Sequence, residues 1–99
     1  MSEFLLEILT PAAPAFRGQV SMVVAPGQDG YFGVLRGHLP LVAALQKGRV
    51  KARESGGDRE WTCGSGVACV EPDRVTLLVE SLAAVAVPGG SDQPAPSAT

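Results

Sequence analysis

The most informative segment of the chain reads Pro26-Gly27-Gln28-Asp29-Gly30-Tyr31-Phe32-Gly33-Val34-Leu35-Arg36-Gly37-His38-Leu39-Pro40. Four of its fifteen residues are glycine, and a proline stands at each end. Glycine enters turns with positive φ at no steric cost, whereas proline fixes φ and donates no hydrogen bond. So many turn residues around the apolar Phe32, Val34 and Leu35 predict a tightly bent backbone rather than a flexible linker.

The sequence on either side of this segment alternates between apolar and polar residues with a period of two, which is typical of β-strands. In residues 49–53, for example, Val50 and Ala52 alternate with three basic residues. Residues 54–59 contain two adjacent glycines and predict a hairpin turn. Residues 41–47 are rich in helix formers, but a helix of seven residues is marginal on its own.

Short strands at roughly eight- to twelve-residue spacing predict an all-β sandwich or barrel. The expected core consists of Phe4, Leu6, Ile8, Val20, Met22, Val24, Val50, Trp61, Val75, Leu77 and Val79. Ninety-nine residues allow one domain with one modest core, which we expect over residues 1–87. Residues 88–99 predict a disordered tail, because Pro, Gly, Ser, Ala and polar residues bury too little apolar surface to offset the entropy of ordering them.

Composition and charge exclude several classes of function. A net charge of −2 creates no large field that would attract nucleic acid or anionic lipid. Four basic residues, Lys47, Arg49, Lys51 and Arg53, recur at strand spacing and are interpreted as a solvated face. No apolar run approaches the roughly eighteen residues that a bilayer crossing needs, and the start of the chain lacks the pattern of a secretory signal. Two cysteines without an export signal suit a reducing cytosol.

No catalytic, metal-binding or cofactor-binding pattern is recognisable in the sequence. His38 is the only histidine, and we interpret it as a turn or interface residue rather than a base. Zinc sites usually need four ligands, commonly in two close pairs, so Cys63 and Cys69 are expected to be buried free thiols. The spacing of Gly27, Gly30 and Gly33 fits neither nucleotide-binding fingerprint. We therefore expect no catalytic residue, no metal and no cofactor.

Four blocks of the sequence carry a resemblance to a known family. They are Glu7-Ile8-Leu9-Thr10-Pro11, Phe16-Arg17-Gly18-Gln19-Val20, Gly30-Tyr31-Phe32-Gly33-Val34-Leu35-Arg36-Gly37-His38-Leu39-Pro40-Leu41-Val42 and Asp73-Arg74-Val75-Thr76-Leu77-Leu78. With these blocks the chain resembles the amino-terminal domain of the ε subunit of the rotary F-type ATP synthase. The resemblance implies a flattened ten-stranded β-sandwich, in which residues 41–47 are strand rather than helix.

The same resemblance implies a function and two contact sites. It implies a non-catalytic subunit of the central stalk, part of the rotor, that links the γ subunit to the c-ring and couples proton or sodium translocation to ATP synthesis. The subunit would be peripheral, on the cytoplasmic face of the inner membrane, and monomeric when isolated. By resemblance the c-ring interface is Gln28, Asp29, Gly30 and Tyr31, and the γ interface is His38, Leu39, Pro40, Leu41 and Val42.

Two other functions stay open at this point. The leading alternative is a free-standing β-domain that binds a peptide or a small ligand along a sheet edge. A weaker one is a small hydrolase that uses His38 as its base.

Longer members of the family continue into two carboxy-terminal helices that restrain rotation, and this chain is expected to be a short form without them. Docking of such helices needs an apolar stripe, and residues 88–99 contain no Leu, Ile, Val, Met or aromatic residue. Deleting residues 89–99 should therefore leave the ATP hydrolysis rate of the assembled complex unchanged. A several-fold activation on deletion would show that this segment restrains the rotor.

Overall fold

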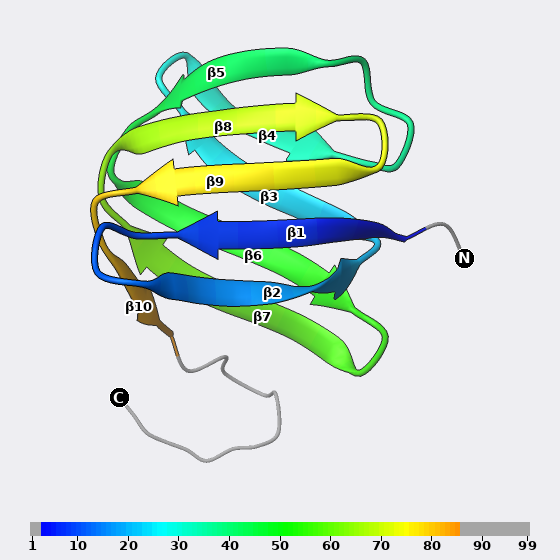
Figure 1. Cartoon of the computed structure of the whole chain (residues 1–99), viewed down its shortest axis with the longest axis horizontal. Helices are drawn as coiled ribbons and strands as arrows, with labels where there is room; N and C mark the ends of the chain where they lie inside the picture. Colours follow the sequence, from blue (N-terminus) through cyan, green and yellow to red (C-terminus); the bar gives the residue numbers. More distant parts are fainter. Residues whose placement is uncertain (1–2, 86–99) are drawn as a thin grey trace.

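Ten β-strands and their connections form the described part of the chain, residues 3–85 of a computed structural model (Figure 1). The strands are β1 (Phe4–Leu9), β2 (Pro14–Val20), β3 (Met22–Gly27), β4 (Gly30–Val34), β5 (Leu41–Leu45), β6 (Gly48–Glu54), β7 (Gly57–Cys63), β8 (Gly66–Glu71), β9 (Arg74–Val79) and β10 (Leu82–Ala84). Residues 88–99, for which the sequence predicts a disordered tail, lie outside the described residues.

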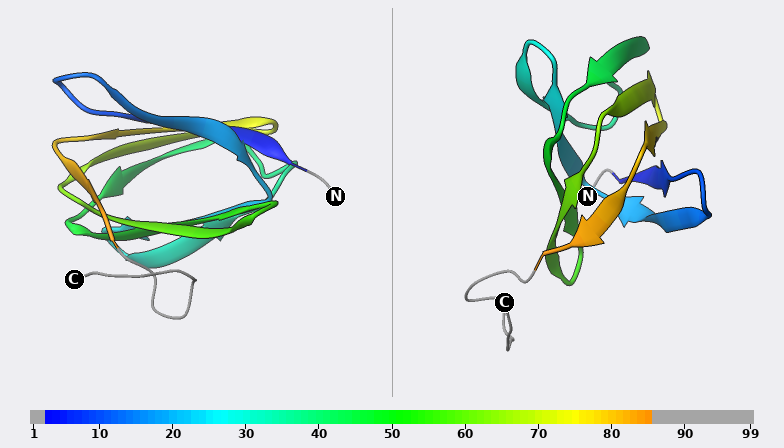
Figure 2. Two further views of the ribbon diagram at one scale, coloured as in Figure 1. Left: turned by 90° about the horizontal axis from the view of Figure 1, so that it is seen from below. Right: turned by 90° about the vertical axis from the view of Figure 1, so that its left-hand side faces the viewer.

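The strands form two layers that face each other (Figure 2). Hydrogen bonding joins them in the order β10-β7-β6-β3-β5-β8-β9-β1-β2, with β4 beside β3. A single residue pair, Gly27 and Leu45, connects β3 to β5, and the sheet passes from one layer to the other there. Strands β1 and β9 are parallel, whereas the other neighbours are antiparallel. The predicted all-β sandwich of ten strands is confirmed.

The core lies between the two layers and is apolar. Among the described residues no polar or charged residue is buried. The buried apolar residues are Phe4, Leu6, Ile8, Val20, Val23, Ala25, Val34, Leu45, Val50, Ala52, Trp61, Cys63, Ala68, Val70, Val75, Leu77 and Val79. Nine of the eleven residues predicted for the core are among them, because alternation assigned the correct face of β1, β6, β7 and β9.

The predicted core is wrong at Met22 and Val24, which are only half-buried, whereas their neighbours Val23 and Ala25 are buried. Sequence alternation treats residues 20–24 as one strand. In the structure Val20 ends β2, and β3 begins after a bend at Ser21, whose N–H donates to the carbonyl of Arg53 at 2.8 Å. Because Ser21 occupies the bend, the alternation shifts by one residue. The side chains of β3 therefore lie on the face opposite to the one that uninterrupted alternation predicts.

Two local predictions about strands and turns are confirmed. Residues 41–45 form strand β5, as the resemblance implies, and pair with β8 along their whole length. The glycine-rich segment 54–59 contains the β6–β7 hairpin, in which only Ser55 and Gly56 lie between the paired residues Glu54 and Gly57. Gly57 has φ of 136°, a value that side chains with a Cβ rarely adopt.

Gly66→Ala should lower the free energy of unfolding by about 1–3 kcal/mol, the usual cost of overpacking. A Cβ at this position would overlap the carbonyl oxygen of Leu78 on the neighbouring strand β9. Gly33→Ala is the matched control, because its added Cβ would lie 3.8 Å from the nearest atom, a methyl carbon of Val24. Urea unfolding followed by the fluorescence of Trp61 measures both variants, and equal destabilisation would contradict the close approach of β8 and β9.

Candidate contact surfaces

The four residues predicted to face the c-ring gather at one end of the β3–β4 hairpin. Gln28 and Asp29 form a two-residue turn between the paired Gly27 and Gly30. Gly30 has φ of 129°, in the region that favours glycine. Gln28, Asp29, Gly30 and Tyr31 are all exposed. The hairpin therefore presents these residues together on a short, sharply bent turn.

A second turn, formed by Gln46 and Lys47 between β5 and β6, lies against the first. The Gln28 N–H donates to the carbonyl of Ala44 at 3.1 Å, and the Gln46 N–H donates to that of Pro26 at 2.9 Å. The side-chain amide of Gln46 adds a bond of 3.2 Å to the carbonyl of Gly27. Three hydrogen bonds thus connect two turns that are separate in the sequence.

Tyr31 makes a further connection that sequence reasoning did not find. Its hydroxyl oxygen accepts the backbone N–H of Arg49 at 3.0 Å, although 57% of the residue is exposed. A Cβ at Gly48 would lie 2.9 Å from this hydroxyl and 2.7 Å from Cβ of Pro26. The side chain of Tyr31 therefore reaches from β4 past β3 to the start of β6, and the glycine leaves room for it.

The predicted γ interface lies at the opposite end of β4, in the β4–β5 connection and the start of β5 (Figure 1). The bend contains Gly37, whose φ is 83° and whose N–H donates to the carbonyl of Pro72 at 2.8 Å. Leu39 and Val42 are 79% and 74% exposed. Leu41, in contrast, is half-buried and packs against the core. The five predicted residues are therefore contiguous, but Leu41 faces inward.

His38 is half-buried in this connection. Its ring nitrogen Nδ1 lies 2.8 Å from the carbonyl oxygen of Leu39, and its backbone N–H donates to the carbonyl of Leu35 at 3.2 Å. One ring nitrogen is thus within hydrogen-bond distance of the adjacent backbone, an arrangement that fits the interpretation of His38 as a turn residue.

We call the layer formed by β5, β8, β9, β1 and β2 the first layer. Exposed and half-buried apolar residues continue from Val42 across its outer face. Register places Val42 beside Cys69 and Ala44 beside Val67, which in turn pairs with Leu78. Leu78 lies beside Leu9 of the parallel strand β1. We call this set the outer apolar strip; it consists of Leu9, Val42, Ala44, Val67, Cys69 and Leu78. A shallow, mostly apolar cavity of about 370 Å³ adjoins it, lined by Leu9, Thr10, Pro11, Leu78, Val79 and Glu80.

Sequence reasoning missed Val67 and Leu78 as surface residues, although both are well exposed, at 37% and 44%. A signal was available in the sequence. Residues 67–70 and 77–79 are apolar at consecutive positions, where a strand with one solvated face would alternate. Continuous apolar runs are typical of strands that are covered on both faces.

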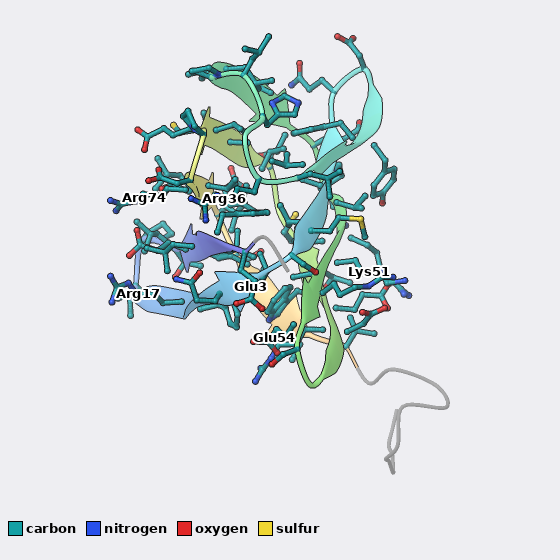
Figure 3. The ribbon with its side chains drawn as sticks, turned by 90° about the vertical axis from the view of Figure 1, so that its right-hand side faces the viewer. Glu3, Arg17, Arg36, Lys51, Glu54 and Arg74 are labelled. Atoms are coloured by element: carbon teal, nitrogen blue, oxygen red, sulfur yellow. The ribbon has the colours of Figure 1, made fainter. Side chains whose placement is uncertain are left out.

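The charged residues of the two outer faces are paired across strands. On the first layer Glu7 of β1 lies 3.1 Å from Arg17 of β2 and 2.6 Å from Arg74 of β9. On the opposite face the predicted basic stripe of β6 meets acids of β7: Arg49 binds Glu60, and Lys51 and Arg53 both bind Asp58. Figure 3 shows Arg17 and Arg74 on one side of the molecule and Lys51 on the other.

The described residues offer little for chemistry. Residues 3–85 contain no group of three or more His, Cys, Asp or Glu side chains that could hold a metal ion. The same residues include no helix long and apolar enough to cross a membrane.

The two cysteines differ from each other. Cys63 is buried at the end of β7, and burial raises the pKa of its thiol above the ordinary 9.0, opposed by a hydrogen bond with the Gly48 backbone. Cys69 is only half-buried, so the prediction of two buried thiols is wrong for this residue. The inward positions of β8 are taken by Ala68 and Val70, and Cys69 between them faces outward.

Comparison with known proteins identifies related chains. A family model described as the ATP synthase delta/epsilon chain, beta-sandwich domain, matches residues 3–85. The ATP synthase epsilon chain of Magnetococcus marinus is 41% identical over 75 residues, which are 76% of this chain and 55% of that one. The epsilon chain of Caulobacter vibrioides is 34% identical over 80 residues, which are 81% of this chain and 93% of that one.

The fold is similar to that of a chain in the Euglena gracilis mitochondrial ATP synthase, with a TM-score of 0.78 over 85% of this chain and 54% of that one. Sequence identity there is 20%, so this likeness concerns the fold alone. The chain spans only 55 to 60% of the length of several of its relatives.

In the folded protein Cys69 should react with a thiol reagent at least tenfold faster than Cys63, because the thiolate is the reactive species and burial disfavours it at Cys63. Alkylation with iodoacetamide at pH 8, followed by peptide mass spectrometry, measures both rates in one sample. In urea the two rates should become similar. Equal rates in the folded protein would contradict the burial of Cys63.

Proposed function

This chain belongs to the ATP synthase delta/epsilon family, and on that premise we propose that it is the epsilon chain of an F-type ATP synthase. It serves as a non-catalytic part of the central stalk that joins the γ subunit to the c-ring. Turning with both, it couples proton or sodium translocation to ATP synthesis. The observation that carries this proposal is the match of the family's β-sandwich domain to residues 3–85. The chain is peripheral, on the cytoplasmic face of the inner membrane, and monomeric when isolated.

A non-catalytic role agrees with the surroundings of the only histidine in the chain. A histidine base in a hydrolase needs a nucleophile within hydrogen-bond reach. Within residues 3–85 the hydrogen bond of the His38 ring joins Nδ1 to the carbonyl oxygen of Leu39 at 2.8 Å, and none joins the ring to a serine, threonine or cysteine. This arrangement makes the hydrolase hypothesis the weakest of the three.

The β3–β4 turn suits contact with polar loops of the c-ring. Gln28 and Asp29 offer amide donors, an amide acceptor and a carboxylate, all exposed. The turn is held by hydrogen bonds to neighbouring strands, so few side chains and little backbone need ordering when a partner binds. A low ordering cost raises the affinity that a small polar contact can reach.

The γ subunit is proposed to cover the β4–β5 connection and the outer apolar strip. Leu39 and Val42 are the most exposed large apolar residues in the described part of the chain. Val67 and Leu78 extend their surface across three strands. A partner that covers this apolar surface removes it from water, which favours binding. An amphipathic helix with one apolar face fits such a surface.

The β3–β4 turn and the β4–β5 connection are far enough apart to contact two partners at once. They lie at opposite ends of β4, a strand of five residues. At about 3.3 Å per residue this strand spans roughly 16 Å. One rigid domain can therefore touch the c-ring at one end and γ at the other, as a stalk subunit must.

One observation favours the alternative of a free-standing domain that binds a peptide. Among residues 3–85, β3 is the one strand that pairs with β4, which leaves the other edge of β4 without a neighbour there and suited to an added strand. The partners that co-purify with the chain distinguish a stalk subunit from a free-standing domain.

A tagged chain extracted with the membrane complex should bring γ and c subunits with it, and their absence would favour the free-standing domain.

Site-directed cross-linking tests the two surfaces. In a Cys69→Ser background, Asp29→Cys carrying a photoactivatable maleimide should cross-link to subunit c, and Val42→Cys should cross-link to γ. Val42 is chosen over its neighbour Leu41 because Leu41 faces the core. Ser55→Cys, in the exposed β6–β7 turn, is the control for non-specific labelling. Cross-linking of Asp29→Cys to γ and of Val42→Cys to c would overturn the assignment of the surfaces.

A further inference from the structure

We propose that the c-ring contact is made by two turns rather than one, and that Tyr31 is the positioning residue that holds them in register. We call the surface the double-turn tip; it consists of Gln28, Asp29, Gln46 and Lys47. The inference rests on the proposed function, because it assigns the partner of this surface to the c-ring. It adds the β5–β6 turn to the surface and gives the Tyr31 hydroxyl a role within the chain.

Strand β6 has a gap in its pairing on the side that faces β3. Strand β3 pairs with β6 only from Met22 to Val24, opposite Arg53 to Lys51. Beyond Lys51 the next residues of β6 have no strand beside them on this side, because β3 turns toward β5 and pairs with it at Gly27. The N–H of Arg49 lies in this gap. An unpaired backbone N–H costs free energy when it is shielded from water.

The side chain of Tyr31 fills this gap. The Tyr31 hydroxyl accepts the Arg49 N–H at 3.0 Å and so takes the place of the missing strand partner. Gly48 permits this approach, because a Cβ there would meet both the hydroxyl and Pro26 at less than 3 Å. The tyrosine thus links the hairpin that carries Gln28 and Asp29 to the strand that follows Lys47.

The double-turn tip presents polar and charged groups to a partner. Its exposed groups are two amides, one carboxylate and one ammonium. Within residues 3–85 neither Asp29 nor Lys47 has an ion-pair partner in the chain, whereas the three basic residues of the adjacent β6 are all paired. A surface with one free charge of each sign fits a polar loop that carries opposite charges and amides. Its complementarity depends on the spacing of the two turns, to which the Tyr31 bond adds a fourth connection beside the three hydrogen bonds of Gln28 and Gln46.

Tyr31→Phe keeps the ring and removes only the acceptor. In the full chain this variant should fold as the wild type does, while exchange of the Arg49 amide proton measured by NMR becomes about tenfold faster. Affinity for the purified c-ring of the same organism in detergent, measured by biolayer interferometry, should fall about fivefold, the factor that corresponds to one hydrogen bond. Affinity for the γ subunit should not change.

Two control variants separate positioning from direct contact. Asp29→Ala and Lys47→Ala should weaken c-ring binding with no effect on exchange at Arg49. The double variant Tyr31→Phe with Lys47→Ala should lose less c-ring affinity than the product of the two single fold-losses, because the hydroxyl acts through the tip. Independent effects, or faster exchange with unchanged c-ring affinity, would overturn the inference. Failure of the wild-type chain to bind the c-ring would instead overturn the proposed function.

Discussion

Strand β3 forms hydrogen bonds with three other strands along its short length, and this sharing constrains the rest of the molecule. Its first half pairs with β6, most of it pairs with β4, and its last residue, Gly27, pairs with β5. Pro26, which has no N–H, stands where pairing with β6 has ended. The sheet can therefore pass from one layer to the other at this corner without leaving a donor of Pro26 unpaired. The double-turn tip and the gap beside Arg49 both follow from that change of partner.

The other side of the sandwich is closed by side chains. Strands β2 and β10 end the hydrogen-bonded order, and in the described part of the chain no ladder joins β2 to β7. Instead the ring of Phe16 lies 4.9 Å from that of Trp61, and the guanidinium of Arg59 lies over Phe16 at 5.4 Å. A Cβ at Gly18 would come within 3.1 Å of the Phe16 ring, so glycine at this position lets the ring lie along β2. Aromatic pairs of this kind add about 0.5–1.5 kcal/mol beyond the area that they bury.

The sequence predicts those parts of this molecule that repeat along the chain, and it fails where a single residue breaks the repeat. Alternation identifies the inward face of most strands, but the bend at Ser21 inverts the faces assigned to Met22 and Val24. Resemblance indicates the β3–β4 turn and the β4–β5 connection as contact sites, which remain predictions, and it carries no information on the bond between Tyr31 and Arg49. That bond joins a side chain to a backbone group eighteen residues away, and such pairs leave no periodic trace. The outward position of Val67 and Leu78 was predictable from the sequence, because apolar residues at consecutive positions indicate a second covered face.

The chemistry of the two proposed surfaces accounts for how one small domain can serve two partners. The outer apolar strip gains free energy from any partner that excludes water from it, so its contact is strong and tolerant of small shifts. The double-turn tip gains free energy only when donors and acceptors are aligned, so its contact is directional and sensitive to geometry. A rotor subunit needs both properties, because one contact must hold it on the shaft and the other must fix its angle relative to the ring.

Cross-strand pairs such as Glu7 with Arg17 and Arg74 tie β1 to its neighbours on the apolar side, and the bonds of Gln46 and Tyr31 tie the two turns on the polar side. In the proposed rotor, torque passes between the two partners through a closed sandwich, whose apolar core resists shear because its side chains interdigitate at high density.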